Sequence, residues 1–428
     1  MIGVVADDIT GANDIGIMFA KLDYLTAVFS HDDFQSVAKK LEEQPEVIIL
    51  ETNSRFDHPE AAYEKVFKAT KDLQHAGADR FYNKTCSVFR GNIGVEFDAM
   101  LDALEEEFAV VVLGFPKNER KTLNGIHFVH GKKLENSEFR NDPMHPMDQS
   151  NLVDILQSQT KRKVSLIHHD VIKKGKDALK LQLVSLKKEY QYVLLDVMDQ
   201  NDLRTIASAV DDVRVLCGSS ALAEELSIAS ESKNTSKHLD ILPPFVNDKG
   251  LFSVAGSLMP QTIEQIQYMK NKGSIVLELD TLDLLERNRE QVIQELASKV
   301  IRNLNEGSDV FLHTSNDAKT VQQTKDLALN KGISNKEISQ FVSSTIAEIT
   351  DLILKNTGQN RLLVAGGDTS AAVCSKLGIR GMRVWKEIGP GLPSCISLSE
   401  PPLLLVLKSG SFGKPNFFEQ AIAHLKGQ

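Results

Sequence analysis

The stretch that decides the fold is IGVVADDITGANDIGIMFAKLDY, residues 2–24. It predicts a short strand over Ile2–Ala6, because a brief apolar run ends there at two adjacent aspartates. Thr10 and Gly11 are typical of a helix cap and turn, and residues 12–22 then carry apolar side chains at helical spacing. A strand, a loop and a helix in this order indicate one unit of an α/β fold.

Asp7 and Asp8 follow this expected strand directly. Open α/β sheets usually bind their ligands at the carboxyl ends of the strands. Neighbouring buried carboxylates repel each other, so such a pair favours a site that meets a cation or hydroxyl groups. The alternative is a solvated loop in which an aspartate caps the helix, and the local sequence gives both interpretations similar weight.

The composition is that of an ordinary globular protein, with 428 residues of which 42% are hydrophobic and 25% are charged. This length predicts two large domains or three small ones. A net charge of -9 without a basic block argues against a nucleic-acid partner. The four cysteines are scattered, which favours reduced thiols and a cytoplasmic protein. We expect no signal peptide, and no apolar run approaches the ~20 residues of a membrane span.

Strand-like and helix-like segments alternate along the whole chain, which predicts mostly parallel sheets flanked by helices. Strands are expected at residues 47–50, 80–82, 110–113, 192–197, 213–217, 251–255, 274–279, 309–313, 361–365 and 403–407. Long helices are expected near residues 282–305 and 336–356. The polar segment 228–250, with its Pro-Pro step, interrupts the alternation. The sequence therefore predicts two α/β domains, residues 1–232 and 246–428.

The second domain carries glycine between strand and helix in three places. These turns are Gly256-Ser257, Gly366-Gly367-Asp368-Thr369, and Lys408-Ser409-Gly410 followed by Gly413. Glycine lets the backbone approach a ligand closely, and the N-terminus of the next helix offers free N–H groups. Three such turns favour a nucleotide-phosphate site over a purely structural use of glycine. None of them matches G-x-x-x-x-G-K-[ST] or G-x-G-x-x-G.

In the first domain, Lys84 and Arg90 flank the loop within NKTCSVFRGNIG, residues 83–94. Arginine suits planar recognition of a carboxylate and lysine supplies a point charge, although the spacing alone slightly favours the alternative, a surface loop with two solvated cations. The dipeptide Asn124-Gly125 predicts a hairpin. Asp142, between Asn141 and Pro143, predicts a turn.

Two further features receive a structural interpretation. His168 and His169 are expected to lie in a strand, where adjacent side chains point to opposite faces, so no protein-held metal site is predicted. The segment 390–393, with Pro390, Gly391 and Pro393, predicts a loop before the last strand.

Taken together, ADDITGANDIG, KTCSVFRGNIG, the stretch from FP through G to NDP-x-x-P, VAGS, AGGDTSAAV and LKSGSFG resemble the four-carbon acid sugar kinase family. The motifs occur in order and cover essentially the whole chain. The resemblance implies an N-terminal substrate-binding domain and a C-terminal nucleotide-binding domain. It also implies ATP-dependent phosphorylation of the terminal hydroxyl of a four-carbon sugar acid, with Mg²⁺ bridging the phosphates largely through water.

Carried over by position, the resemblance implies ATP contacts at Ser257, Gly366, Gly367, Asp368, Thr369 and Gly410, and sugar-acid contacts at Asp7, Asp8, Lys84, Arg90 and Gly91. Lys84 and Arg90 would pair with the substrate carboxylate, and Asp8, Asp7 or Asp368 would accept the proton of the attacking hydroxyl. One departure is Cys86, which stands where family members commonly have aspartate in K-x-D-S-x-x-R-G-N.

The substrate prediction is D-threonate or D-erythronate, because GAND with Asn13 resembles the D-threonate branch more than the GATD of 3-oxo-tetronate kinases. The alternative within the family is 3-oxo-tetronate (2-dehydrotetronate). An NAD-dependent hydroxy-acid dehydrogenase also fits two α/β domains but lacks the dinucleotide fingerprint, and a non-catalytic nucleotide sensor is the third class. Two ligands on different domains predict closure over the reactants. A homodimer is common among such enzymes.

Overall fold

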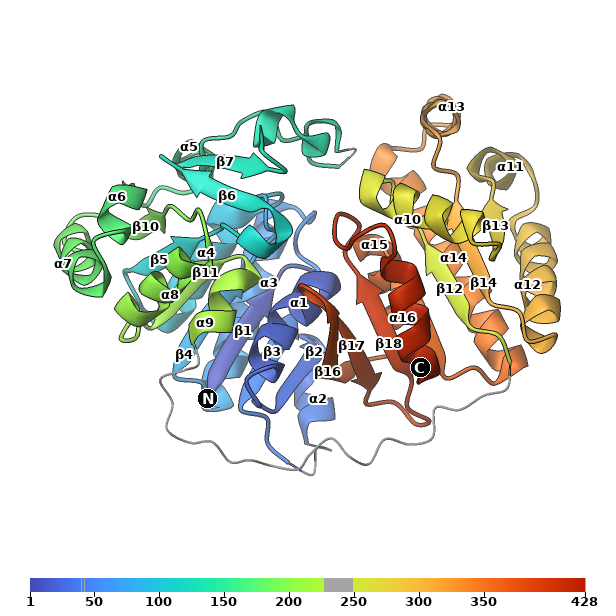
Figure 1. Cartoon of the computed structure of the whole chain (residues 1–428), viewed down its shortest axis with the longest axis horizontal. Helices are drawn as coiled ribbons and strands as arrows, with labels where there is room; N and C mark the ends of the chain where they lie inside the picture. Colours follow the sequence, from blue (N-terminus) through green and yellow to red (C-terminus); the bar gives the residue numbers. More distant parts are fainter. Residues whose placement is uncertain (40, 42, 143, 227–248, 428) are drawn as a thin grey trace. The chain divides into compact units, whose positions relative to one another are not determined.

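The computed structural model of the protein describes residues 1–39, 41, 43–142, 144–226 and 249–427. The chain forms two compact units, residues 1–236 and 237–428 (Figure 1). The domain boundary predicted at residues 228–250 lies almost entirely outside the described residues. Across the described residues, no helix has the length and apolar character that a membrane crossing requires.

Unit 1 contains a parallel sheet with the strand order β2-β3-β1-β4-β11-β5-β10-β9. The strands are β1 Ile2–Ala6, β2 Thr26–Ser30, β3 Val47–Glu51, β4 Arg80–Lys84, β5 Ala109–Val112, β9 Val164–Ile167, β10 Tyr192–Leu195 and β11 Val215–Gly218. Most of them are short, nearly continuous apolar runs, as expected for strands that are covered on both faces, whereas β4 also carries Arg80, Asn83 and Lys84.

Helices lie on both faces of this sheet (Figure 1). Helix α1 contacts α9, which contacts α8, and α3 contacts α4 elsewhere on the unit. The α-helices are α1 Ile9–Ala20, α2 Phe34–Ala38, α3 Pro59–His75, α4 Ile93–Leu104, α5 Leu152–Gln157, α6 His169–Ile172, α7 Lys176–Leu186, α8 Gln200–Ala209 and α9 Ala223–Leu226. Short 3₁₀ turns occur at η1 Pro116–Asn118, η2 Leu134–Asn136, η3 Glu138–Asn141 and η4 Ser220–Leu222.

A small antiparallel sheet in unit 1 consists of β6 Arg120–Leu123, β7 Ile126–Val129 and β8 Lys132–Lys133. The hairpin predicted at Asn124-Gly125 is confirmed, since these two residues connect β6 and β7. Their φ angles are 53° and 74°, the backbone that Asn-Gly readily adopts in a tight hairpin.

Unit 2 contains a sheet with the order β13-β14-β12-β15-β18-β17-β16. The strands are β12 Phe252–Ala255, β13 Ile275–Leu279, β14 Val310–Thr314, β15 Arg361–Ala365, β16 Gly381–Gly389, β17 Leu392–Ser397 and β18 Leu404–Lys408. The part from β13 to β18 is parallel, and β17 runs antiparallel to both β18 and β16. The predicted α/β class with mostly parallel sheets is confirmed.

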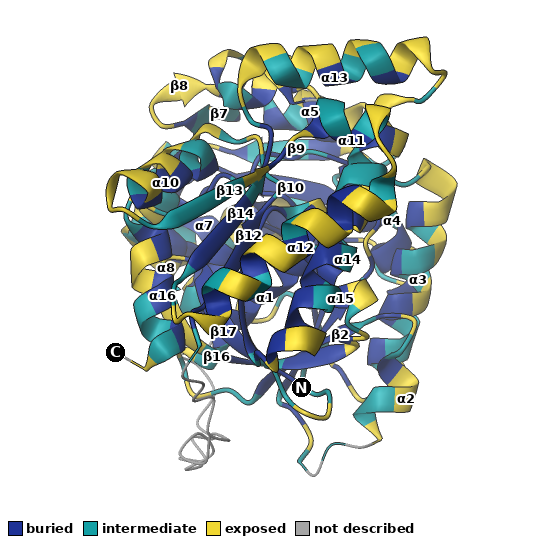
Figure 2. Cartoon of the chain, turned by 90° about the vertical axis from the view of Figure 1, so that its right-hand side faces the viewer, coloured by how far each residue is buried: buried dark blue, intermediate teal, exposed yellow. Residues whose placement is uncertain are grey.

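The helices of unit 2 are amphipathic and cover buried strands (Figure 2). They are α10 Pro260–Asn271, α11 Thr281–Glu286, α12 Arg289–Asn305, α13 Ala318–Asn330, α14 Asn335–Thr357, α15 Gly367–Lys376 and α16 Phe417–Lys426. In α12 the buried residues Val292, Ile293, Ala297, Val300 and Leu304 repeat at helical spacing. The exposed face of the same helix is yellow in Figure 2.

The structure corrects two predicted helices. Helix α1 begins at Ile9 rather than at residue 12, because Asp8 is its N-cap, so Thr10 and Gly11 lie inside the helix. The single helix predicted over residues 282–305 is two helices, α11 and α12. Asn288 separates them with an extended backbone, and its side chain accepts the first free N–H groups of α12.

Two structural predictions elsewhere were also wrong. Residues 390–391 form the turn of the β16–β17 hairpin, and Pro393 lies inside β17. Strand β9 ends at Ile167, so His168 and His169 are not strand residues. His169 begins α6, and its Nε2 lies 3.0 Å from Oδ2 of Asp202.

Candidate functional site

The central strands of unit 1 end at one level of the sheet. Ala6 at the end of β1 is the register partner of Glu51 in β3 and of Lys84 in β4. Lys84 is in turn paired with Gly218 of β11. These strand ends and the segments that follow them therefore meet at one edge, which holds every residue predicted to bind the sugar acid.

Asp7 and Asp8 are both buried, and the guanidinium group of Arg55 connects them. Nε and Nη2 of Arg55 donate to the two carboxylate oxygens of Asp7 at 2.7 and 2.8 Å, and Nη1 donates to Asp8. Oδ1 of Asp8 accepts the N–H of Gly11 at 2.6 Å. Burial alone would raise the pKa of Asp8, but the charges of Arg55 and Lys84 outweigh it and lower that pKa. Asp8 is therefore an ionised acceptor at neutral pH.

Lys84 is fully enclosed beside α1. Its Nζ donates to the carbonyl of Thr85 at 3.0 Å and lies 3.5 Å from Oδ2 of Asp14. A Cβ atom on Gly11 would come within 3.0 Å of this Nζ, so the glycine allows the helix to lie close to the lysine. Burial raises the pKa of Asp14 to about 6, although the charge of Lys84 opposes the shift.

Arg90 is held by three neighbours. Its Nη1 lies 2.5 Å from Oδ2 of Asp142, its Nε donates to Sγ of Cys86 at 3.4 Å, and its guanidinium lies 5.2 Å from the ring centre of Phe139. Burial would raise the pKa of the Cys86 thiol, but the charges of Arg90 and Arg55 overcome this and lower it. Cys86 therefore ionises more readily than an ordinary cysteine, at the position where family members commonly have aspartate.

Gly91 has a structural reason to be glycine. Its φ is +102°, and a Cβ atom would lie 2.7 Å from the carbonyl oxygen of Arg55. The next residue, Asn92, donates through Nδ2 to the carbonyls of Ser54 at 3.0 Å and Asp57 at 2.9 Å. These contacts fix the segment that carries Arg90 against the segment that carries Arg55.

Two glutamates near the aspartate pair have strongly raised pKa values. Burial raises the pKa of Glu51 and of Glu96 to about 8, and the negative charges of Asp8 and Asp7, respectively, add to the effect. Ser54 donates to Oε1 of Glu96 at 2.7 Å. These two acids are largely protonated at neutral pH, which limits the negative charge at this edge.

The three glycine turns of unit 2 also meet at one edge. Ala255 of β12 is the register partner of Ala365 of β15, and Ala365 is the partner of Lys408 of β18. The N–H of Gly256 donates to the backbone carbonyl of Ala365 at 3.0 Å, and the N–H of Gly366 donates to the backbone carbonyl of Lys408 at 2.8 Å. Each turn thus starts at the end of one of three neighbouring strands.

The turns pack so closely that side chains larger than hydrogen are excluded. A Cβ atom on Gly256 would lie 2.2 Å from Oγ1 of Thr369, and one on Gly410 would lie 2.2 Å from Oγ of Ser257. Gly366 has a φ of +118°, which favours glycine. The structure therefore brings together Ser257, Gly366, Thr369 and Gly410, as expected from their motifs.

Helix α15 begins at Gly367, beside these turns, and its N-cap residue Gly366 supplies no side-chain cap. The free N–H groups and partial positive charge of such a helix start suit phosphate oxygens. Asp368 lies exposed in the first turn of the helix, whereas Thr369 is buried. Within the described ranges, no group of three or more His, Cys, Asp and Glu side chains is placed to hold a metal ion.

Sequence reasoning missed Arg55 and Asp142 as members of the unit 1 site. Arg55 lies in a polar stretch after β3. The sequence feature that could have placed it at the site was that β3 was expected to end at the same edge of the sheet as β1. Asp142 does form the predicted turn, since Oδ1 accepts the N–H groups of Met144 and His145 at 3.0 and 2.9 Å. Its other carboxylate oxygen binds Arg90, which the local sequence did not reveal.

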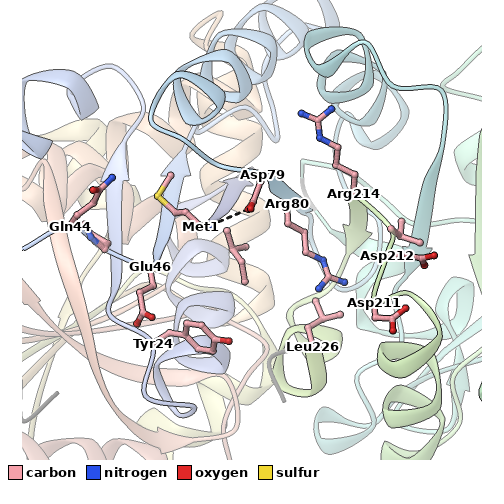
Figure 3. A pocket seen from close by; sticks show the side chains of 13 residues that line it. Met1, Tyr24, Gln44, Glu46, Asp79, Arg80, Asp211, Asp212, Arg214 and Leu226 are labelled. Carbon is pink, nitrogen blue, oxygen red and sulfur yellow. Dashed lines mark hydrogen bonds and ion pairs between the residues drawn. The ribbon is translucent and has the colours of Figure 1, made fainter. Parts of the chain in front are cut away.

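Unit 1 also has an open cavity of about 760 Å³ near the amino ends of β1 and β4 (Figure 3). Its lining mixes both charges, including Arg80, Arg214, Asp211 and Asp212, and Met1 donates to Asp79 at 3.1 Å beside it. Ligands of parallel sheets bind at the carboxyl ends of strands, so this cavity is not where the predicted site residues lie.

Comparison with protein families matches both units. The model described as a sugar-binding N-terminal domain matches residues 2–226. The model described as a nucleotide-binding C-terminal domain matches residues 252–418.

Curated relatives match over nearly their whole length. A 3-oxo-tetronate kinase of Haemophilus influenzae is 31% identical, with 98% of this chain and 99% of the relative covered. A 3-oxo-tetronate kinase of Pseudomonas savastanoi pv. phaseolicola is 29% identical, with coverage of 100% and 98%.

Two solved structures are also similar over nearly the whole chain. A Salmonella typhimurium LT2 protein has a TM-score of 0.78 at 26% identity, with 98% of each chain covered. The Haemophilus influenzae protein HI1011 has a TM-score of 0.69 at 29% identity, with 99% of this chain and 100% of that chain covered.

Proposed function

We propose that this chain, which belongs to the four-carbon acid sugar kinase family, phosphorylates 3-oxo-tetronate at its terminal hydroxyl with ATP. Membership rests on the sugar-binding and nucleotide-binding models, which together match residues 2–226 and 252–418. The observation that carries the substrate is the end-to-end similarity to several 3-oxo-tetronate kinases at about 30% identity. Neither a dehydrogenase nor a nucleotide sensor accounts for that similarity.

The relatives favour the alternative substrate over the main prediction from the sequence. The motif GAND with Asn13 suggested D-threonate or D-erythronate, but one residue is weak evidence beside full-length similarity. Asn13 is fully buried, and its Nδ2 donates to the carbonyl of Ile9 at 2.9 Å. A side chain engaged inside its own helix is poorly placed to select a substrate.

In unit 1 we assign the sugar acid to the edge that holds Asp8, Lys84 and Arg90. The two cations would attract the substrate carboxylate and fix which end of the acid faces the nucleotide. Asp8, an ionised acceptor, would bind substrate hydroxyl groups. Asp7 would act mainly by holding Arg55, because both of its oxygens already accept from that guanidinium.

In unit 2 we assign ATP to the glycine turns. Ser257, Thr369, the N–H groups at the start of α15 and the backbone at Gly410 would hold the phosphates. The donor set fits Mg²⁺ bound mainly by phosphate oxygens and water, with the exposed carboxylate of Asp368 as a protein ligand. Bound Mg²⁺ would neutralise the charge that develops on the phosphates.

In phosphoryl transfer the protein forms few covalent bonds itself. Its main contributions are to align the hydroxyl group with the γ-phosphate and to offset the charge that develops in the transition state. Asp8 is the proposed acceptor of the hydroxyl proton and Asp368 is the rival. A low pKa makes Asp8 a weak base in the ground state, but the transferred proton is released only as the phosphoryl group arrives. Closure of the domains over the reactants stays a prediction.

The test is identification of the product. The protein is incubated with ATP and Mg²⁺ and with either 3-oxo-tetronate or D-threonate, and mass spectrometry and phosphorus–proton NMR locate the new phosphate. A parallel reaction contains NAD in place of ATP. We expect one phosphate on the terminal carbon, and none in a control without ATP. Phosphorylation of D-threonate but not of 3-oxo-tetronate would support the substrate predicted from the sequence. Reduction of NAD without phosphate transfer would contradict the proposal.

A further inference from the structure

We propose that Lys408 is a positioning residue of the nucleotide site. Its buried ammonium group gathers the carbonyl oxygens of the turn formed by residues 409–413, and so directs the N–H groups of this turn toward the phosphates of ATP. The inference rests on the proposed function, since it assumes that this turn binds ATP.

Lys408 is the last residue of β18 and is fully buried. Its Nζ lies 2.8 Å from the carbonyl oxygen of Ser409, 3.0 Å from that of Gly410 and 3.1 Å from that of Phe412. It also lies 3.0 Å from Oγ1 of Thr262 in α10. Within the described part of the chain, no carboxylate forms a salt bridge with this ammonium. Backbone oxygens of the turn therefore stabilise a charge that would otherwise be costly to bury.

Two side chains of helix α10 also form hydrogen bonds with this turn. Oγ1 of Thr262 donates to the carbonyl of Gly410 at 2.8 Å. Nε2 of Gln265 lies 3.1 Å from the carbonyl oxygen of Phe412, 3.0 Å from that of Gly413 and 3.0 Å from that of Lys414. Lysine, threonine and glutamine thus draw successive carbonyl groups to one side of the turn.

The orientation of the carbonyls determines that of the N–H groups. In a planar trans peptide, the C=O and the following N–H point in opposite directions. With the carbonyls of Ser409, Gly410 and Phe412 directed at Nζ, the N–H groups of the residues that follow each of them point to the opposite side. Several N–H groups on one side of a short turn form an anion-binding nest.

The lysine acts through the turn rather than by touching a phosphate. Its Nζ is already surrounded by four oxygen atoms, more than the three protons of an ammonium group can serve. The side chains that contact its Nζ are neutral among the described residues, namely Thr262 of α10 and the ring of Phe418 of α16, whose centre lies 5.8 Å away. Gln265 of α10, which binds the same carbonyl of Phe412 as the lysine, is also neutral. Burial lowers the pKa of Lys408 to about 7, so its charge changes near neutral pH.

The first experiment is the variant Lys408→Met, which keeps the length of the side chain and removes the ammonium. Loss of charge-assisted hydrogen bonds predicts that ADP binding, measured by calorimetry at about pH 6, weakens by about tenfold or more. In turnover, the KM for ATP rises by a similar factor, while kcat and the KM for the sugar acid change little. The ADP affinities of wild type and variant converge at alkaline pH, because the wild type then loses the same charge.

The variant Thr262→Val gives an independent test if Lys408→Met does not fold. It removes one support of the turn and predicts a smaller loss of ADP affinity in the same direction. Thr350→Val in α14 is the matched control, because Thr350 is equally buried but, among the described residues, its hydroxyl group bonds only within its own helix, to the carbonyl of Ile346.

Unchanged ADP affinity in Lys408→Met, or in Thr262→Val where only that variant folds, would overturn the inference. An equal loss of ADP affinity in the control Thr350→Val would also overturn it, since that result indicates general damage to the fold. Calorimetry with ADP needs no sugar acid, so a failed substrate assignment would leave this test intact. If the wild type binds no ADP, both the proposed function and this inference fail.

Discussion

Arg55 offsets one of the two negative charges of Asp7 and Asp8 at the edge of unit 1, because it binds Asp7 with two nitrogen atoms and Asp8 with the third. Sequence reasoning identified the two aspartates but not this partner, since a lone arginine in a polar loop has no local signature. The same holds for Asp142 and Arg90, which are far apart in the chain. Pairings of this kind depend on the register of neighbouring strands and loops, which a local pattern does not specify.

The variant Asp8→Asn tests the role of Asp8 as the base. Asparagine caps helices as well as aspartate does, so α1 should be retained, but loss of the charge that faces Arg55 and Lys84 should lower the melting temperature. We expect kcat to fall by about 10²-fold or more, the size typical for loss of a general base, with the KM for ATP nearly unchanged. Near-normal kcat would exclude Asp8 as the base, and Asp368→Asn would be examined next.

Cys86 is predicted to ionise more readily than an ordinary cysteine, because the charges of Arg90 and Arg55 lower its pKa below 9.0. The pKa values of Cys217 and Cys395 are raised by burial, so these thiols stay protonated. The measurement is thiolate absorbance against pH in the wild type minus that in Cys86→Ser. A difference spectrum whose midpoint lies at or above 9.0 would be incompatible with this environment.

At the level of elements, sequence patterns located most parallel strands because most of them are short apolar runs between helices, but they did not identify β2, β16 or β17. They were less successful at element ends. Asn288 divides one expected helix into two through its backbone and side-chain cap, although its neighbours keep helical spacing. The hairpin of β16 and β17 was read as a loop, because Pro390, Gly391 and Pro393 resemble loop composition more than strand composition.

Glu96 in α4 predicts a pH-dependent stability. Its folded-state pKa of about 8 lies above the ordinary value of 4.5, so between these values the folded protein binds more protons than the unfolded chain. Stability from this group is therefore complete below about pH 4.5 and is lost as the pH rises through about 8. Thermal unfolding should show the wild type losing stability relative to Glu96→Gln over this range.

The exposed Glu64 on α3, changed to Gln, is the control for the Glu96 measurement. A melting-temperature difference between wild type and Glu96→Gln that does not change with pH would contradict the assigned ionisation.

The variant Gly410→Ala tests the close packing of the nucleotide turns. Its new Cβ would lie 2.2 Å from Oγ of Ser257, so this hydroxyl group, which we assign to the phosphates, must move. Small displacements of catalytic groups are costly, and we expect kcat/KM for ATP to fall by about 10²-fold. Gly378→Ala is the control, since Gly378 has a φ of +67° but open space around it. If Gly410→Ala and Gly378→Ala lower kcat/KM for ATP equally, packing of Gly410 against Ser257 is unimportant for ATP use.

At the scale of the whole molecule, the two units carry different chemistry on the same kind of sheet edge. Unit 1 presents buried charges, with Arg55, Lys84 and Arg90 among carboxylates, and unit 2 presents glycine turns and a helix start. The sequence predicted this difference between the units, because the motifs with charged residues occur in the first half of the chain and the glycine turns in the second. Each set was expected to follow strands of its own sheet. The choice among four-carbon acids was not predictable in this way, since it depends on the three-dimensional arrangement of groups from several loops.

The most direct measurement is ADP formation from ATP and Mg²⁺ with 3-oxo-tetronate, D-threonate, D-erythronate and L-threonate, each at a range of concentrations. We predict that 3-oxo-tetronate has the highest kcat/KM and that turnover without a sugar acid is negligible. Protein that binds ATP but forms no ADP with any of the four acids would contradict the assignment as a four-carbon sugar-acid kinase.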